Sequence, residues 1–125
     1  MRKYTYGITA FYLVIILCFL IQSVSAQTAP TNPTLSVSVS GTTVSLSWSA
    51  ANADSYLLYA APYPDASVIY DFNMGTQTTA SFDLPADSAF YLAVRASNSS
   101  GLSDWSNIES FVIGSITPPP GAANT

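Results

Sequence analysis

The sequence predicts an all-β protein, a seven-stranded antiparallel β-sandwich, and three observations support this prediction. Apolar and polar residues alternate with a period of two through much of the chain after residue 33, which is the pattern of strands with one buried face. Glycine, proline, asparagine and aspartate residues interrupt these runs at short intervals. No helical periodicity follows the first 26 residues. Short alternating runs divided by turns are typical of two packed sheets.

The first two expected strands form a hairpin around Ser40-Gly41, where glycine supplies the positive φ of a tight turn. On both sides of this turn apolar residues alternate with serines, with Leu35, Val37 and Val39 before it and Val44, Leu46 and Trp48 after it. The third strand follows the break at residues 52–54, carries Tyr56, Leu58 and Ala60 on one face, and ends at Pro62 and Pro64.

The remaining strands are expected at residues 67–72, which would form a short edge strand, and at residues 78–84, 89–97 and 106–113. A turn is expected at residues 73–75. The phase of the last strand stays open, because Ile108 and Val112 compete with Phe111 and Ile113 for the inward face. The alternation gives the following expected core: Leu35, Val37, Val44, Leu46, Trp48, Tyr56, Leu58, Ala80, Phe82, Leu84, Phe90, Leu92, Val94 and Ala96.

Residues 84–103 resemble the end of a fibronectin type III domain. In that family a leucine closes strand E, a proline-containing corner follows, and an aromatic residue opens strand F. Leu84, Pro85 and Phe90 match these positions. An Ala-x-Asn-x-x-Gly-x-Ser signature then runs from Ala96.

Upstream, Trp48 and Tyr56 look like the strand B tryptophan and the strand C tyrosine of the same family. The resemblance covers about residues 33–113. It implies an immunoglobulin-like sandwich with strands A, B and E in one sheet and strands C′, C, F and G in the other. The family serves as spacers, adhesion units and enzyme accessories, so the resemblance implies a fold rather than one activity.

Two positions depart from the family pattern. Phe90 stands where the family usually has a tyrosine whose hydroxyl bonds back to the corner. Residues 101–106 look like the Trp-Ser-x-Trp-Ser box of cytokine-receptor modules, with Leu102 in place of its first tryptophan. Arg95 and Trp105 could form a single cation–π rung there, worth about 0.5–1 kcal/mol, although many type III domains end in a similar sequence.

The first 26 residues are predicted to be a secretory signal peptide cleaved before Gln27. A basic start precedes an apolar run at residues 8–21, and small residues follow at the cleavage position. The run is short for a span of roughly 30 Å, which takes about 20 residues; a membrane anchor formed by an uncleaved segment is the alternative. We expect a linker at residues 27–33, the domain at 34–113, and a disordered proline-rich tail at 114–125.

Cleavage would leave Arg95 as the only cation against seven Asp and Glu residues, a net charge of −6, with no lysine, cysteine or histidine. Such a surface disfavours nucleic acid and anionic membranes. Histidine, cysteine and lysine, which usually take part in nucleophilic, acid–base or zinc chemistry, are missing, so we expect no enzyme activity, no cofactor and no metal site. Asp83 with Asp87, or Asp71 with Asn73, could be drawn as a glycosidase pair or a calcium site, but such acids are usually solvated turn residues.

The candidate interaction surface lies on the outward face of strands C and F. The alternation that turns Tyr56 and Leu58 inward turns their neighbours outward, and the expected surface comprises Leu57, Tyr59, Tyr70, Tyr91, Arg95 and Trp105. Contiguous exposed aromatic residues often mark a contact site for protein or sugar, but cross-strand tyrosine pairs also stabilise ordinary sheets.

The sequence therefore predicts a secreted, non-catalytic module that acts in protein interaction or as a spacer. The alternative is a carbohydrate-binding accessory module of a secreted polysaccharide-degrading system. A protein or a neutral glycan is the expected partner, and the oligomeric state stays open.

Overall fold

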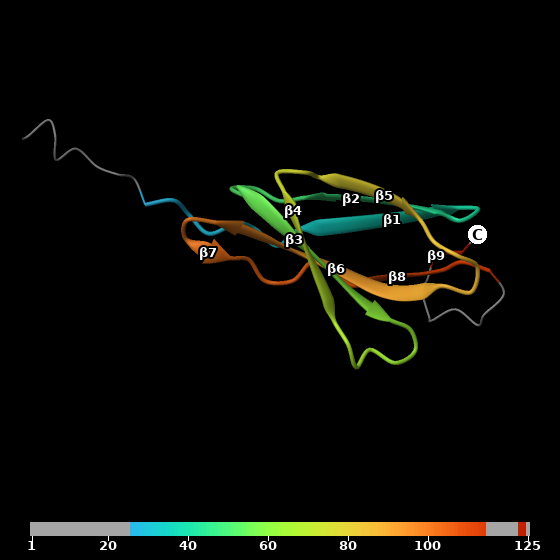
Figure 1. Ribbon diagram of the computed structural model, residues 1–125. Coiled ribbons are helices and arrows are strands. Elements are labelled where there is room, and N and C mark those ends of the chain that lie inside the picture. Colours follow the sequence, from blue (N-terminus) through green and yellow to red (C-terminus); the bar gives the residue numbers. More distant parts are fainter. Residues whose placement is uncertain (1–25, 115–122, 125) are drawn as a thin grey trace, which may run out of the picture.

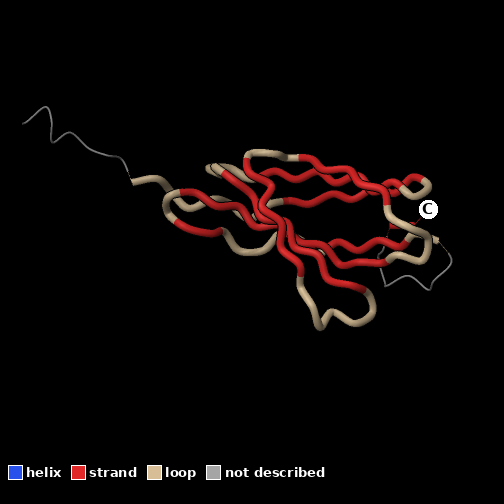
Figure 2. The backbone as a smooth tube through the Cα atoms, viewed as in Figure 1, coloured by secondary structure: helices blue, strands red, loops and turns tan. Residues whose placement is uncertain are grey.

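The structure is a computed structural model that describes residues 26–114 and 123–124. Two sheets pack face to face, as Figures 1 and 2 show. The first has the order β1 (Thr34–Ser40), β2 (Thr43–Ser49) and β5 (Thr79–Asp83). The second has the order β4 (Tyr70–Gly75), β3 (Ser55–Pro62), β6 (Ala89–Asn98), β8 (Glu109–Val112) and β9 (Ala123–Asn124), and β7 (Gly101–Leu102) pairs with β6. The expected all-β sandwich and the division of its strands between two sheets are confirmed.

The β1–β2 hairpin forms as the alternation predicts. Leu35 lies opposite Trp48 and Val37 lies opposite Leu46 in the register, so their side chains share the inner face. Gly41 has φ of 61° at the turn, where a side chain would be strained. The serines of β2 remain exposed on the outer face.

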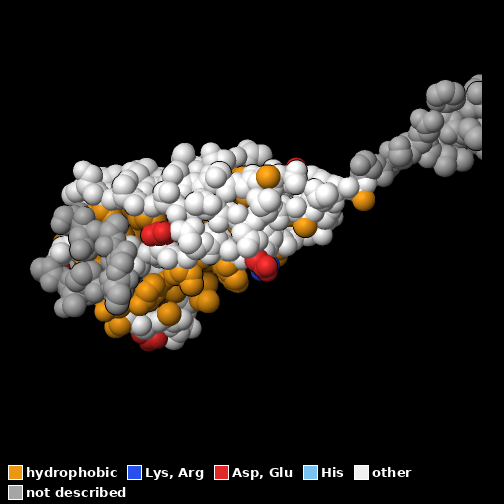
Figure 3. All heavy atoms as spheres, turned by 180° about the vertical axis from the view of Figure 1, so that it is seen from behind, with side chains coloured by type: hydrophobic (Ala, Val, Ile, Leu, Met, Phe, Trp, Pro, Cys, Tyr) orange, Lys and Arg blue, Asp and Glu red, His pale blue; other side chains and the backbone are white. Residues whose placement is uncertain are grey.

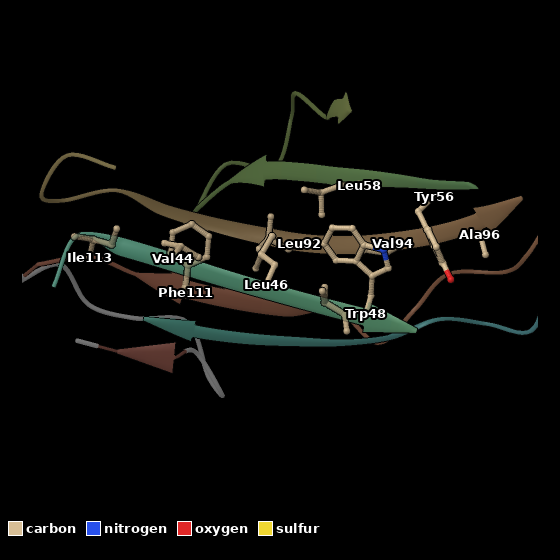
Figure 4. Close-up of a cluster of buried hydrophobic side chains, with 11 residues drawn as sticks. Val44, Leu46, Trp48, Tyr56, Leu58, Leu92, Val94, Ala96, Phe111 and Ile113 are labelled. Atoms are coloured by element: carbon tan, nitrogen blue, oxygen red, sulfur yellow. The ribbon is translucent and has the colours of Figure 1, made fainter. Parts of the chain in front are cut away.

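The core lies between the sheets, where side chains of β2 and β6 point toward one another (Figure 4). Every residue of the expected core is in this cluster, either buried or partly buried against it. Trp48 contacts Tyr56 edge to face at 6.2 Å between ring centroids, and its indole N–H donates to the Gln77 carbonyl at 3.0 Å. In the last strand Phe111 and Ile113 join the core cluster, Val112 is also buried at 2% exposure, and Ile108 is 72% exposed.

The edge strand differs from the prediction. It was expected at residues 67–72 with a turn at 73–75, but β4 runs over Tyr70–Gly75. Asp65 accepts a hydrogen bond from the Ser67 amide at 3.0 Å, which holds the preceding residues in a loop. The strand ends at Gly75, whose φ is 55°, and the Gln77 amide donates to the Met74 carbonyl at 3.1 Å. The alternation alone did not reveal that the turn begins three residues later.

The two flanking segments also contact the domain. In the expected linker, Pro30 and Pro33 are buried, and Thr31 exchanges hydrogen bonds with Ala51 at 3.1 and 2.8 Å. Ala123 and Asn124, within the segment expected to be disordered, pair with β8. The predicted signal peptide at 1–26 lies almost entirely outside the described residues, as do residues 115–122 of the tail. In the part that the structure describes, no helix is long and apolar enough to cross a membrane.

The corner before β6 is fastened by backbone bonds. The Asp87 amide donates to the Ile113 carbonyl at 2.6 Å, and the Ile113 amide donates to the Ser88 carbonyl at 2.8 Å. Phe90 stands at the position where the family has its corner tyrosine, and its ring packs on Phe111 with 5.8 Å between centroids. The ring therefore contributes packing, while main-chain bonds join the corner to the last strand.

Candidate interaction groove

The outward face of β3 and β6 is the floor of the candidate site. In the register, Tyr59 lies opposite Ala93 and Ala61 lies opposite Tyr91. Each tyrosine is therefore beside an alanine on the neighbouring strand, and the small side chain leaves room next to the large one. This alternation of large and small residues produces a hollow rather than a flat sheet face.

The segment between β7 and β8 carries Trp105 and is bonded to β6 by two serines. The Ala96 and Val94 amides donate to the hydroxyls of Ser103 and Ser106 at 2.9 and 2.8 Å. The amides of the same serines donate back to the carbonyls of Ala96 and Val94 at 2.8 and 2.9 Å. Both serines are buried. The spacing Ser-x-x-Ser thus holds the segment against the strand and leaves Trp105 between the two attachments.

Trp105 is 47% exposed and is held from two sides. The Tyr59 ring meets it edge to face, with 4.6 Å between centroids and 69° between planes. The Arg95 guanidinium lies 5.1 Å from the indole centroid, and its Nε donates to the Ser103 carbonyl at 2.8 Å. The expected cation–π contact between Arg95 and Trp105 is therefore present. It helps to hold the exposed indole ring in one orientation.

The loop between β3 and β4 forms the opposite wall. Tyr63 meets Tyr91 edge to face with 5.7 Å between centroids. This contact places the loop over the first residues of β6. Ile69, 62% exposed, and Ile108, 72% exposed, border the hollow. We call this feature the aromatic groove; it has a volume of about 390 Å³ and is lined by Tyr59, Ala60, Ala61, Ala66, Ile69, Tyr91, Leu92, Ala93, Trp105 and Ile108.

The groove is hydrophobic and its border is acidic. On the face that Figure 3 shows, hydrophobic side chains gather beside the loop between β3 and β4, and acidic side chains lie around them. The polar side-chain atoms among the lining residues are the two tyrosine hydroxyls and the indole N–H. The Arg95 guanidinium already stacks on the indole ring and donates a hydrogen bond to the Ser103 carbonyl. The groove can therefore bury an apolar group and offers few hydrogen bonds.

The structure brings together four of the six residues of the expected surface. Tyr59, Tyr91 and Trp105 line the groove, and Arg95 stacks on Trp105. Leu57 lies opposite Arg95 in the register but is not a lining residue.

Tyr70 lies opposite Ala60 in the register but is not a lining residue of the groove. The groove also contains Ala66, Ile69 and Ile108, which are not among the residues expected from the sequence. Ala66 and Ile69 lie in a loop, where no alternation of apolar and polar residues indicates which way the side chains point. Ile108 belonged to one of the two possible phases of the last strand.

Within residues 26–114 no group of three or more His, Cys, Asp or Glu side chains gathers in a way that could hold a metal ion. The acid pairs considered from the sequence have structural contacts. Asp83 accepts a hydrogen bond from the Thr43 hydroxyl at 2.5 Å, and Asn73 accepts one from the Gly75 amide at 2.9 Å.

Solved structures with a similar fold include fibronectin type III domains. A myokine structure matches with a TM-score of 0.58 and 16% identity, over 69% of this chain and 99% of that chain. A mutant of FN3tt matches with a TM-score of 0.57 and 21% identity, over 68% and 97%. The FN5 domain of Drosophila Lar matches with a TM-score of 0.56 and 16% identity, over 69% and 98%.

No protein-family model matches the sequence, and no curated protein matches it significantly. The fold is that of a fibronectin type III-like domain. Identities this low establish the fold and not the function.

Proposed function

We propose that the chain is a secreted, non-catalytic module that binds a partner protein through the aromatic groove. The observation that carries the proposal is the exposed indole ring of Trp105, which Tyr59 and Arg95 hold in place before any partner arrives. A side chain that is ordered in advance loses little conformational entropy on binding. Tryptophan and tyrosine are also the residues that most often dominate binding energy at protein interfaces.

Protein is favoured over a neutral glycan by the shape of the groove. The two aromatic pairs stand at 69° and 66°, so these rings do not form one flat platform on which sugar rings could stack. A glycan would also bury hydroxyl groups against a lining with few polar atoms, which is costly without hydrogen bonds. An apolar side chain of a protein partner has no such requirement.

The non-catalytic part of the proposal rests on the residues that are present. Residues 26–114 contain no histidine, lysine or cysteine, the side chains that most often act as nucleophiles or general bases. The secreted part rests on the basic, apolar and small-residue regions at the N-terminus. Intact mass of the exported protein tests it, because a mass that still includes residues 1–26 would contradict cleavage before Gln27.

The binding experiment uses immobilised protein to capture partners from the envelope and culture medium of the source organism. A double variant, Tyr59→Ser with Tyr91→Ser, removes both rings from the groove floor. If these rings are central to the interface, capture should weaken by about 30-fold or more, the loss expected for a hot spot of about 2 kcal/mol. A polysaccharide panel run in parallel tests the glycan alternative.

Tyr70→Ser is the matched control, because Tyr70 is an exposed tyrosine outside the groove. It should leave capture unchanged. Equal capture by the double variant and the parent protein would contradict the proposal, provided that both show a cooperative thermal transition. Binding to the polysaccharide panel that depends on Tyr59 and Tyr91 would replace the protein partner with a glycan.

A further inference from the structure

A second hydrophobic feature lies between the two sheets and shares the lining residues Ala60 and Leu92 with the aromatic groove. It is a cleft of about 300 Å³ lined by Leu58, Ala60, Phe72, Met74, Ala80, Phe82, Leu84, Phe90, Leu92 and Phe111. None of these side chains carries a hydrogen-bonding oxygen or nitrogen atom. We call it the inter-sheet cleft. Its lining comes from both sheets and includes the two strands β4 and β5, which are the last strands of their sheets on this side.

Small residues explain why the cleft is not filled by the chain itself. Ala60 on β3 and Ala80 on β5 occupy inward positions where the surrounding residues are leucine and phenylalanine. Phe72 of β4, which lines the cleft, is 51% exposed, and Tyr70 on the same strand is 49% exposed. Two large aromatic side chains on one edge strand are thus left half in water.

The opposite side of the sandwich is covered by an added strand. There β9 pairs in parallel with β8 and also lies against β1. Phe111 and Val112 of β8 are only 1% and 2% exposed. Within residues 26–114 and 123–124, no corresponding strand lies beside β4 or β5. The same architecture therefore has one edge completed by an extended segment and one edge left open over a hydrophobic cleft.

We propose that the free edge of β4 accepts an extended segment of a partner protein as an additional strand, whose apolar side chains cover the inter-sheet cleft. A strand beside β4 would form main-chain hydrogen bonds with its outer edge, the usual basis of binding by strand addition. Because successive side chains of a strand point to opposite faces, every second residue of the segment would point toward Phe72 and the cleft.

Charge indicates which residues the partner segment carries on its outward face. The alternate residues of the segment would lie on the outward face, beside Asp71 of β4. The described chain has seven carboxylates and one cation, so lysine or arginine fits at these positions. A second copy of the chain is disfavoured as the occupant, because pairing β4 with β4 would bring two Asp71 side chains and two strongly acidic surfaces together. The partner segment therefore alternates apolar and basic residues.

The test uses two synthetic peptides of the same composition, one alternating valine with lysine and one with the valines and lysines in separate blocks. The alternating peptide should bind at least about tenfold more tightly in calorimetric titration, a difference of about 1.4 kcal/mol. Amide hydrogen exchange should show new protection at residues 70–73. Equal affinity of the two peptides, or protection that omits β4, would overturn the proposal.

Two variants keep this result separate from the function proposed above. Ala80→Leu fills the cleft and should weaken binding of the alternating peptide while leaving the melting temperature unchanged or higher. Tyr59→Ser alters the aromatic groove and should leave peptide affinity unchanged. Loss of peptide binding in Tyr59→Ser together with full binding in Ala80→Leu would place the peptide in the groove and refute strand addition. A second copy would be the occupant if the free protein sediments as a dimer and its β4 amides are protected from exchange without peptide.

Discussion

The hydroxyl groups of Ser103 and Ser106 are expected to contribute strongly to stability. Each accepts a hydrogen bond from a main-chain amide of β6, at Ala96 and Val94 respectively, and both of these β6 residues are 0% exposed. Each hydroxyl also donates to a nearby carbonyl, that of Asp104 at 2.7 Å or that of Asn107 at 2.8 Å. Alanine at either position removes an acceptor and a donor together.

The expected cost follows from the burial of the amides. A buried donor that loses its partner costs about 1–3 kcal/mol, and the amide at Val94 has no access to water that could replace the serine oxygen. Ser106→Ala should therefore lower the free energy of unfolding by about 1–3 kcal/mol. For a domain of this size each kcal/mol lowers the melting temperature by roughly 4–8 °C. The two serines fasten one segment, so the double variant need not show an additive loss.

Urea denaturation followed by tryptophan fluorescence measures this loss, because Trp48 is buried in the core. Ser45→Ala is the matched control: Ser45 is an exposed serine on β2, and its substitution should change stability by no more than about 0.5 kcal/mol. A loss for Ser106→Ala no larger than that of the control would show that the Val94 amide finds another acceptor, and the reasoning would fail.

The same variant has a second readout in the aromatic groove. With the attachment removed, Trp105 should sample more orientations and become easier to quench with acrylamide in the folded protein. A stability loss without any change in quenching would mean that Arg95 and Tyr59 suffice to hold the ring.

Three further outcomes are expected. Phe90→Ala should cost about 3 kcal/mol of unfolding free energy, near the lower end for phenylalanine truncation because the ring is only partly buried, whereas Tyr91→Phe should be nearly silent in the same melts. A larger loss for Tyr91→Phe would contradict the assigned faces of β6. Gly114→Ala should cost about 1–3 kcal/mol by calorimetry, because φ is +99° there and a Cβ would come within 2.9 Å of the Asp87 amide nitrogen; an unchanged melting temperature would refute this. Arg95→Gln should cost about 0.5–1 kcal/mol and shift the emission of the neighbouring indole ring, and an unshifted spectrum would count against the rung.

The fold was predictable because nearly every strand has one buried face. In β2 each serine alternates with Val44, Leu46 or Trp48, and such a pattern permits only one register relative to the core. The last strand resisted prediction because Phe111, Val112 and Ile113 are all nearly fully buried. Where both faces of a strand are covered, the period of two disappears from the sequence.

The groove was predictable only in part, for a related reason. Tyr59 and Tyr91 follow from strand phase, and Trp105 follows from the family signature. Ile69 lies in a loop, where no periodic pattern links sequence to direction. The role of Ser103 and Ser106 was also not evident, because serine is common in this chain and its two buried hydroxyls are not distinguished from exposed ones by sequence.

The two proposed contact regions share Ala60 and Leu92 among their lining residues, but they should differ in their response to salt. Asp71 lies on the outward face of β4, opposite Tyr59 in the register, so it borders both the aromatic groove and the free strand edge. No charged side chain lines the groove, and a partner held there by apolar contact should bind with nearly the same affinity at low and high ionic strength. A basic segment beside β4 would face Asp71 and the acidic surface, so its affinity should fall as salt screens these charges. Asp71→Asn should therefore weaken the alternating peptide and remove part of its salt dependence, while leaving a partner of the groove little affected.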